Sequence, residues 1–149
     1  MQNQIKVKNQ NKVLNQIKSN SGAYLLEVHV RRPFKIRKGR FEGLTLPAGY
    51  YYYAGSAQKN LRQRISRHYR NDKVLHWHID HITAFRGNKI TNCWIFEDAP
   101  KEMECRVTER LISEFSLASV IKGFGSSDCR NCESHLLAGG QSPLAAISF

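Results

Sequence analysis

A run of four consecutive tyrosines, residues 50–53, restricts the fold of this chain more than any other feature of its sequence. Aromatic residues are enriched in strands, and a Pro-Ala-Gly turn signal precedes the run at residues 47–49. We therefore expect a strand over residues 50–54. Successive side chains of a strand point to opposite faces, so alternate tyrosines share a face. Tyr51 and Tyr53 lie on one face and Tyr50 and Tyr52 on the other.

Strand-like and helix-like segments alternate along most of the remaining chain. Residues 23–30 and 89–96 are rich in β-branched and aromatic side chains, which predicts two further strands. Apolar side chains at helical spacing predict helices over residues 58–70 and 101–116, with a short helical stripe over residues 75–82. The resulting order β, β, α, α, β, α predicts a small mixed α/β (α+β) domain. Its first two strands form a hairpin with a long basic excursion between them.

The length of 149 residues is sufficient for one domain but not for two, since domains most often have about 100–150 residues. Residues 1–20 contain no acidic or aromatic residue, and we expect them to form a disordered basic arm before a domain at residues 21–149. The Gly- and Ser-rich sequence after residue 119 predicts an irregular tail. No run approaches the roughly 18–20 apolar residues of a membrane helix, so we expect a cytoplasmic protein without membrane contacts.

The positive charge is concentrated in the first two thirds of the chain. The formal net charge is +11, and residues 1–96 contain 18 Lys and Arg against four acidic residues. Such a field attracts polyanions, so we expect structured or duplex DNA as the partner, with RNA as a second polyanion that the charge allows. The alternative is a solvated basic face that aids solubility. The candidate contacts are Arg31, Arg32, Lys35, Arg37, Lys38, Arg40, Lys59, Arg62, Arg67 and Arg70, while His76 and His78 could contact nucleic acid or pack beside Trp77.

Several short motifs follow one another in a recognisable order. They are Gly22-Ala23-Tyr24, Tyr53-Ala54-Gly55, Leu61-x-x-Arg64-Ile65-x-x-His68 and then a glutamate in a helix. Together they resemble the GIY-YIG nuclease superfamily. The resemblance is greatest to its stand-alone Uri-type branch, through the phrases YYYAGSA, RHYR, HWHID, a Glu-Cys pair and FGSSDC. It covers residues 22 to about 137 and implies a small GIY-YIG-type domain, with a short, mainly antiparallel sheet flanked by helices, that acts as a metal-dependent DNA endonuclease.

The resemblance also implies roles for five residues. Tyr24 or Tyr53 would activate water, Arg64 would hold the scissile phosphate, and His68 would assist proton transfer or orient a tyrosine. Glu104 would hold Mg²⁺ or Mn²⁺. A phenol with an ordinary pKa of about 10 acts as a base only when cations lower that pKa, and we expect Arg64 to do so. The alternatives are tyrosines that pack in the core and an arginine in a surface salt bridge.

Helix geometry supports the choice of Glu104 independently of the resemblance. At about 100° per residue, Glu104 lies within the same apolar stripe as Val107 and Leu111. A carboxylate on an inward stripe needs a compensating cation, so we expect Arg64 or a divalent metal beside it. A buried structural Glu–Arg pair is the alternative, and Glu109 is the candidate if the helix has another register.

The chain departs from the pattern of the superfamily at three places. The basic residues 31–49 lengthen the connection between the two tyrosine motifs, and they would form a charged flap over the site or an extra DNA contact. Ser56 follows the glycine of the second motif, where many relatives have a lysine. The asparagine that relatives carry after the metal helix has no clear match, and the nearest candidates are Ser126, Ser127 and Asp128.

A cluster of soft ligands near the C-terminus predicts a zinc site. Cys129-x-x-Cys132-x-x-His135 places three such ligands within seven residues, and Cys105 follows Glu104 directly. The alternative is that the thiols pack as small apolar groups. Two rival functions therefore stand beside the nuclease: a nucleic-acid-binding module without catalysis and a zinc-stabilised interaction module. An inward acid is of no use to a pure binder, which favours the nuclease.

Overall fold

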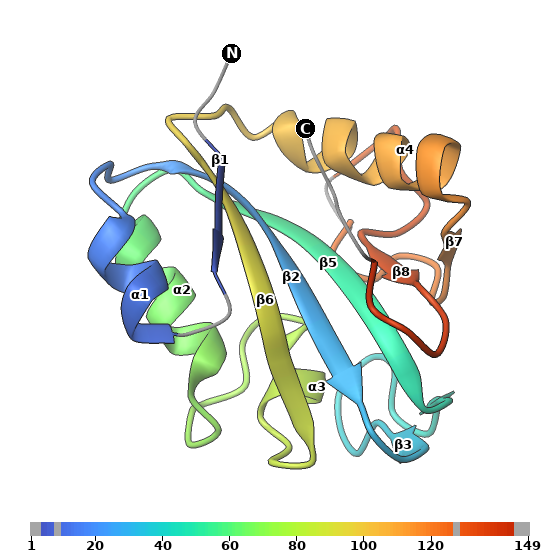
Figure 1. Ribbon diagram of the computed structural model, residues 1–149. Coiled ribbons are helices and arrows are strands. Elements are labelled where there is room, and N and C mark those ends of the chain that lie inside the picture. The colour runs from blue at the N-terminus through green and yellow to red at the C-terminus, as the bar shows by residue number, and fades with distance from the viewer. Residues whose placement is uncertain (1–3, 8–9, 127–128, 145–149) are drawn as a thin grey trace.

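The computed structural model describes residues 4–7, 10–126 and 129–144, which form a central sheet with helices on both faces (Figure 1). The sheet has six strands in the order β1-β6-β2-β5-β8-β7, and every pair of neighbours is antiparallel. A separate ribbon pairs β3 with β4. The expected mixed α/β fold with an antiparallel sheet is therefore confirmed. The strands are β1 (Gln4–Val7), β2 (Gly22–Val30), β3 (Phe34–Lys35), β4 (Thr45–Leu46), β5 (Gly49–Ala57), β6 (Asn88–Glu97), β7 (Ala118–Ser119) and β8 (Leu136–Ala138).

Of the described helices, three pack on one face of the sheet and one packs on the other. The first three are α1 (Gln10–Gln16), α2 (Leu61–Tyr69) and α3 (Asp80–Thr83), whose apolar residues share one buried cluster. The fourth, α4 (Met103–Phe115), belongs to a second cluster on the opposite face. Among the described helices, none is both long and apolar enough to cross a membrane.

The alternation predicted for the tyrosine run is present in β5. Tyr51 and Tyr53 belong to the cluster under α1, α2 and α3, whereas Tyr52 belongs to the cluster under α4, where Tyr50 packs against it. The hairpin expected between the first two long strands is present too, because β2 pairs with β5 along nine residues on each side. Tyr24 of β2 joins the same face as Tyr53.

The N-terminal segment is not a disordered arm in its described parts. Strand β1 pairs with β6, which would otherwise be the exposed edge of the sheet. Helix α1 buries Val13 completely, and Ile17 just after the helix is 6% exposed. Val13 and Ile17 are four positions apart, as on one face of a helix, but most of their neighbours are Gln, Asn and Lys. A single pair of apolar positions is too short a pattern to establish a helical period. Tertiary packing rather than local preference orders this segment.

The tail after residue 119 also contains regular structure that we did not expect. Residues of β8 pair with β5 in the register Tyr52↔Leu137, and both leucines of β8 are buried. Phe124, in the preceding loop, has no exposed surface. A strand of three residues is too short to show an alternating pattern, so only its pairing with β5 reveals it.

The packing of α1 predicts that replacing Val13 destabilises the protein. Val13→Ala removes two buried methyl groups and leaves a cavity, so the free energy of unfolding should fall by about 2 kcal/mol. Urea unfolding followed by circular dichroism measures the change. Asn15→Ala, at an exposed position of the same helix, is the control and should be nearly neutral. Equal stabilities of the two variants would mean that α1 is not packed in solution.

Candidate functional site

A cavity of about 560 Å³ lies where β5 extends beyond the end of its partner β8. The last residue of β5 that pairs with β8 is Tyr53, so past this point side chains from both faces of the sheet meet around the open edge. This cavity, which we call the tyrosine cavity, is lined by Tyr24, Tyr53, Gly55, Ser56, Gln58, Lys59, Arg64, His76, Trp77, His78, Lys101, Glu104 and Gly125. Four of the five predicted catalytic residues thus share one cavity, and the fifth, His68, lies behind Tyr24.

Two glycines allow the tyrosine rings to lie close to the backbone. A Cβ atom on Gly55 would lie only 2.7 Å from Cζ and from the hydroxyl of Tyr24. A Cβ on Gly125 would lie 2.7 Å from Cε1 of Tyr53, and Gly125 has a φ of +70°. Any larger residue at either position would therefore displace a tyrosine from the cavity.

Tyr24 and His68 form a buried hydrogen-bonded pair. The Tyr24 hydroxyl lies 2.7 Å from Nε2 of His68, and both side chains are almost fully buried. His68 belongs to the buried stripe of α2, together with Leu61 and Ile65. Burial, reinforced by nearby Lys73, lowers the pKa of His68 to about 3, so its imidazole is neutral near pH 7.

The tyrosines are weaker acids than we expected. Burial raises the pKa of Tyr24 far more than the adjacent Arg64 lowers it. Burial likewise raises the pKa of Tyr53, and the neighbouring Tyr24 and Glu104 add to the effect. Arg64 does lower the pKa of Tyr24, as expected, but the expected net decrease of that pKa is wrong for the protein alone, because desolvation outweighs one cation.

Arg64 is fixed by contacts on two sides, and in the part of the chain that the structure describes it does not form the surface salt bridge considered above. Its Cζ atom lies 4.4 Å from the centre of the Trp77 ring, and Nη1 donates to the Ser56 carbonyl at 3.0 Å. Lys59 and Lys101 also line the cavity, whereas Glu104 is its only acidic residue among the described residues. The cavity is therefore suited to an anion such as a phosphate.

Glu104 occupies the inward position that helix geometry predicts. Val107 and Leu111 are buried on the same helix, while Glu109 is exposed and is not the inward acid. The Glu104 side chain is 12% exposed, and Oε1 lies 3.4 Å from Nδ1 of His135. The other carboxylate oxygen accepts a hydrogen bond from the Ser56 hydroxyl. Ser56 thus orients the acid.

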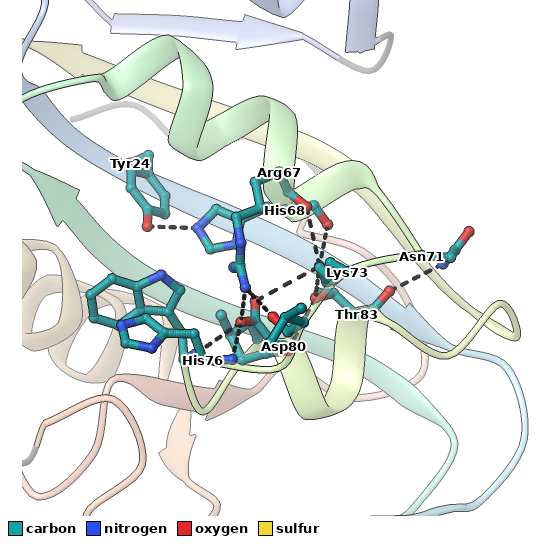
Figure 2. A network of polar contacts seen from close by, with 11 residues as sticks. Tyr24, Arg67, His68, Asn71, Lys73, His76, Asp80 and Thr83 are labelled. Carbon is teal, nitrogen blue, oxygen red and sulfur yellow. Dashed lines mark hydrogen bonds and ion pairs between the residues drawn. The ribbon is translucent and has the colours of Figure 1, made fainter.

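Asp80 is a central residue of the site that sequence reasoning missed (Figure 2). It is fully buried and forms an ion pair with Arg67, with contacts of 2.9 and 2.8 Å. It also accepts hydrogen bonds from the backbone N–H groups of His76 and Trp77, at 2.9 and 2.8 Å. Asp80 therefore holds the loop that places Trp77 over Arg64. The one feature of the sequence that could have identified Asp80 is its place as the acidic residue of the HWHID phrase.

The predicted DNA-binding residues are distributed over several surfaces. Arg67 is engaged with Asp80 and is not a free phosphate contact. His78 accepts a hydrogen bond from the Gly125 N–H and packs against Phe41, which places the segment 31–49 at the border of the cavity. A second cavity of about 1050 Å³ is lined by Arg31, Arg32, Lys35 and Arg37, and Lys38 lies beside Arg37. Arg40 lies over the Phe41 ring, and Lys59 lines the tyrosine cavity. The remaining candidates are exposed to solvent: Arg62, Arg70 and His76.

The resemblance implies an asparagine after the metal helix, for which Ser126, Ser127 and Asp128 were the candidates. Among the described residues, none of these candidates takes its place. Ser126 is buried and its hydroxyl donates to the Glu133 carbonyl oxygen at 3.1 Å, so it supports the loop and does not line the cavity. Ser127 and Asp128 lie outside the described residues.

A cluster of side chains that can bind a metal lies beside Glu104, outside the tyrosine cavity. The ligand atoms of Cys105, Cys129, Cys132 and His135 all lie within 4.8 Å of one another, so this set could hold a metal ion. Three of these residues were predicted from their spacing. Cys105 was not included, because it is distant in sequence and only the position of α4 brings it to the cluster. Its place beside Glu104 was the one available signal.

The Asp80 network predicts a specific loss of stability. Burial alone would raise the pKa of Asp80, but the hydrogen bonds from Arg67 and two backbone amides outweigh it and lower the pKa. Ionised Asp80 therefore stabilises the fold above the ordinary carboxyl pKa of about 4, and this contribution is lost as the pH falls through its lower folded-state pKa. Asp80→Asn should lower the free energy of unfolding by about 3 kcal/mol at pH 7 and by less under acidic conditions.

Chemical denaturation at pH 7 and at pH 3 measures both parts of this expectation. Asp72→Asn, at an exposed position in the preceding loop, is the control for loss of one negative charge. If the two variants had equal stability at pH 7, Asp80 would not hold the loop.

Comparison with known proteins identifies a family. The searches of curated proteins and of solved structures found no match. A family match extends over residues 23–148, which include the long strands, the tyrosine cavity and the Cys and His cluster. The chain belongs to the family described as Domain of unknown function DUF123.

Proposed function

We propose that this protein is a divalent-metal-dependent endonuclease that hydrolyses phosphodiester bonds of DNA, as members of the GIY-YIG superfamily do. The observation that supports the proposal best is the shared cavity of two phenols, one guanidinium and one carboxylate. Its lining contains Lys59, Arg64 and Lys101 against a single acid, Glu104. This balance suits a phosphate and leaves one carboxylate for a metal ion.

Each residue contributes a separate step. Arg64 is held over the Trp77 ring and offers its guanidinium to the scissile phosphate. The hydrogen bond to His68 fixes the direction of the Tyr24 hydroxyl, which makes Tyr24 a better candidate than Tyr53 for contact with the attacking water. For this step Tyr24 first passes its own hydroxyl proton to solvent, and the phenolate oxygen then takes a proton from the water. The water oxygen bonds to phosphorus while the bond between phosphorus and the leaving oxygen breaks, and the electron pair of that bond stays on the leaving oxygen. His68 does not line the cavity, so it acts as a positioning residue.

Glu104 supplies only one ligand for a hard divalent cation, so oxygen atoms of the substrate and of water would have to supply the others. Mg²⁺ is usually bound by one or two carboxylates together with waters and substrate phosphates, and Glu104 supplies one carboxylate. Mn²⁺ accepts the same oxygen ligands. The bound cation would supply positive charge that lowers the pKa of a nearby phenol and neutralises phosphate oxygens. This charge would offset the desolvation that keeps Tyr24 protonated in the protein alone.

Metal-dependent nicking of DNA tests the proposal. The purified chain is incubated with plasmid, branched and single-stranded DNA in the presence of Mg²⁺, Mn²⁺ or EDTA. We expect nicking that EDTA abolishes, and a loss of at least about 100-fold in Glu104→Gln and in Arg64→Gln. Glu114→Gln, at an exposed position of the same helix, is the control and should retain activity.

Two outcomes would contradict the nuclease and identify a rival. DNA retention without nicking under any metal condition would identify a nucleic-acid-binding module that does not catalyse. A chain that neither retains nor cuts DNA would fit the zinc-stabilised interaction module, whose surface would lie around Cys129 and Cys132.

The basic cavity beside β3 predicts a salt-dependent contact with the DNA backbone. Arg31 and Arg32 line it together with Phe34 and Phe85, so a phosphate and an unstacked base could both contact this surface. In the double variant Arg31→Gln/Arg32→Gln, the slope of log K against log salt should decrease by about 2. Fluorescence anisotropy with labelled DNA at several salt concentrations measures it. The double variant Arg106→Gln/Lys122→Gln removes the same charge from other exposed positions, and an equal change there would reject a localised contact.

A further inference from the structure

The cluster of Cys105, Cys129, Cys132 and His135 has dimensions that suit a tetrahedral metal ion. Zinc–sulfur bonds of about 2.3 Å in a tetrahedron place two sulfur atoms about 3.8 Å apart. In the structure, the Sγ atoms of Cys105 and Cys129 are 2.9 Å apart, Sγ of Cys105 is 3.7 Å from Nε2 of His135, and no pair exceeds 4.8 Å. The observed separations therefore bracket those of a four-coordinate site.

The donor types select among metals. Three thiols and one imidazole are soft or borderline ligands, which zinc prefers, whereas Mg²⁺ prefers oxygen. Cys129 and Cys132 have the two-residue separation common in structural zinc sites. This cluster and the oxygen ligand Glu104 thus suit different metals, although Glu104 and Cys105 are consecutive residues of α4.

The His135 ring is held so that its two nitrogens face two different sites. Its backbone N–H donates to the Phe124 carbonyl at 2.9 Å, and its carbonyl accepts from the Ala54 N–H at 3.1 Å. Nε2 faces Sγ of Cys105, and Nδ1 faces Oε1 of Glu104 at 3.4 Å. When one ring nitrogen binds a metal, the other carries the proton and donates to a carboxylate or carbonyl. Metal at Nε2 would therefore make Nδ1 a donor to Glu104.

We infer that Cys105, Cys129, Cys132 and His135 bind one Zn²⁺, and that zinc-bound His135 holds the Glu104 carboxylate in the tyrosine cavity. The zinc site itself is independent of the proposed function, whereas the importance of holding Glu104 rests on it. His135 is a positioning residue in this arrangement. Zinc is a structural ion that fixes the start of α4 against the loop before β8.

Metal content and spectroscopy test the zinc site directly. Protein purified without chelator should contain about one zinc per chain. The Co²⁺-substituted protein should show the visible absorption of tetrahedral cobalt and the charge-transfer absorption of thiolate ligands. A long-range ¹H–¹⁵N spectrum of the histidines should show His135 bound through Nε2 and protonated at Nδ1. Zinc-free protein, or thiol titration that reveals a Cys105–Cys129 disulfide, would overturn the site.

The link to the cavity is tested with a matched pair of variants. Glu104→Ala removes the partner of Nδ1 and should weaken zinc binding by about 10-fold, measured by competition with a fluorescent chelator. Glu102→Ala removes an exposed acid two residues earlier and should leave the affinity unchanged. Circular dichroism verifies that both variants fold. Equal zinc affinity in the two variants would overturn the contact between His135 and Glu104.

These measurements fail separately from the nuclease test. Zinc-loaded protein that cuts no DNA would reject the proposed function and leave the zinc site standing. Protein that nicks DNA but binds no zinc would reject the zinc site and leave the nuclease standing.

Discussion

The contact between the Tyr24 ring and the β5 backbone at Gly55 determines where the other groups of the cavity lie. The antiparallel register places Tyr24 opposite Gly55, and the missing side chain lets the ring lie over the strand toward its open edge. His68 and α2 then pack behind the ring, which carries Arg64 to the rim. The next residue, Ser56, points to the other face and meets Glu104 of α4. One glycine thus allows groups from both faces to meet.

Two buried polar contacts support this cavity from opposite faces of the sheet. Asp80 ties the loop that bears Trp77 to α2, and His135 lies against Glu104 on the side of α4. Both side chains are almost fully buried, so their partners are needed to offset the cost of desolvation. The supports lie outside the cavity lining, yet they decide how the lining residues are oriented.

Burial also limits the chemistry that the cavity can perform by itself. Desolvation keeps Tyr24 protonated and His68 neutral, so neither is a charged catalyst in the protein alone. Positive charge remains at the better-solvated rim, on Arg64 and the lysines. If the protein is the nuclease that we propose, the site would become reactive when a substrate and a cation enter it, because only then would new charges act in a partly dry environment.

The sequence alone determined the features that depend on local periodicity. The two-faced tyrosine strand and the inward position of Glu104 follow from side chains a few residues apart, since strand and helix geometry fix their directions. Only the tertiary structure decided the packing of Val13, the pairing of β8, the role of Asp80 and the entry of Cys105 into the metal cluster. The tertiary structure also raises the pKa of Tyr24, which we expected from the sequence to be lowered. These features arise from partners far apart in sequence, and desolvation by such partners leaves no local pattern.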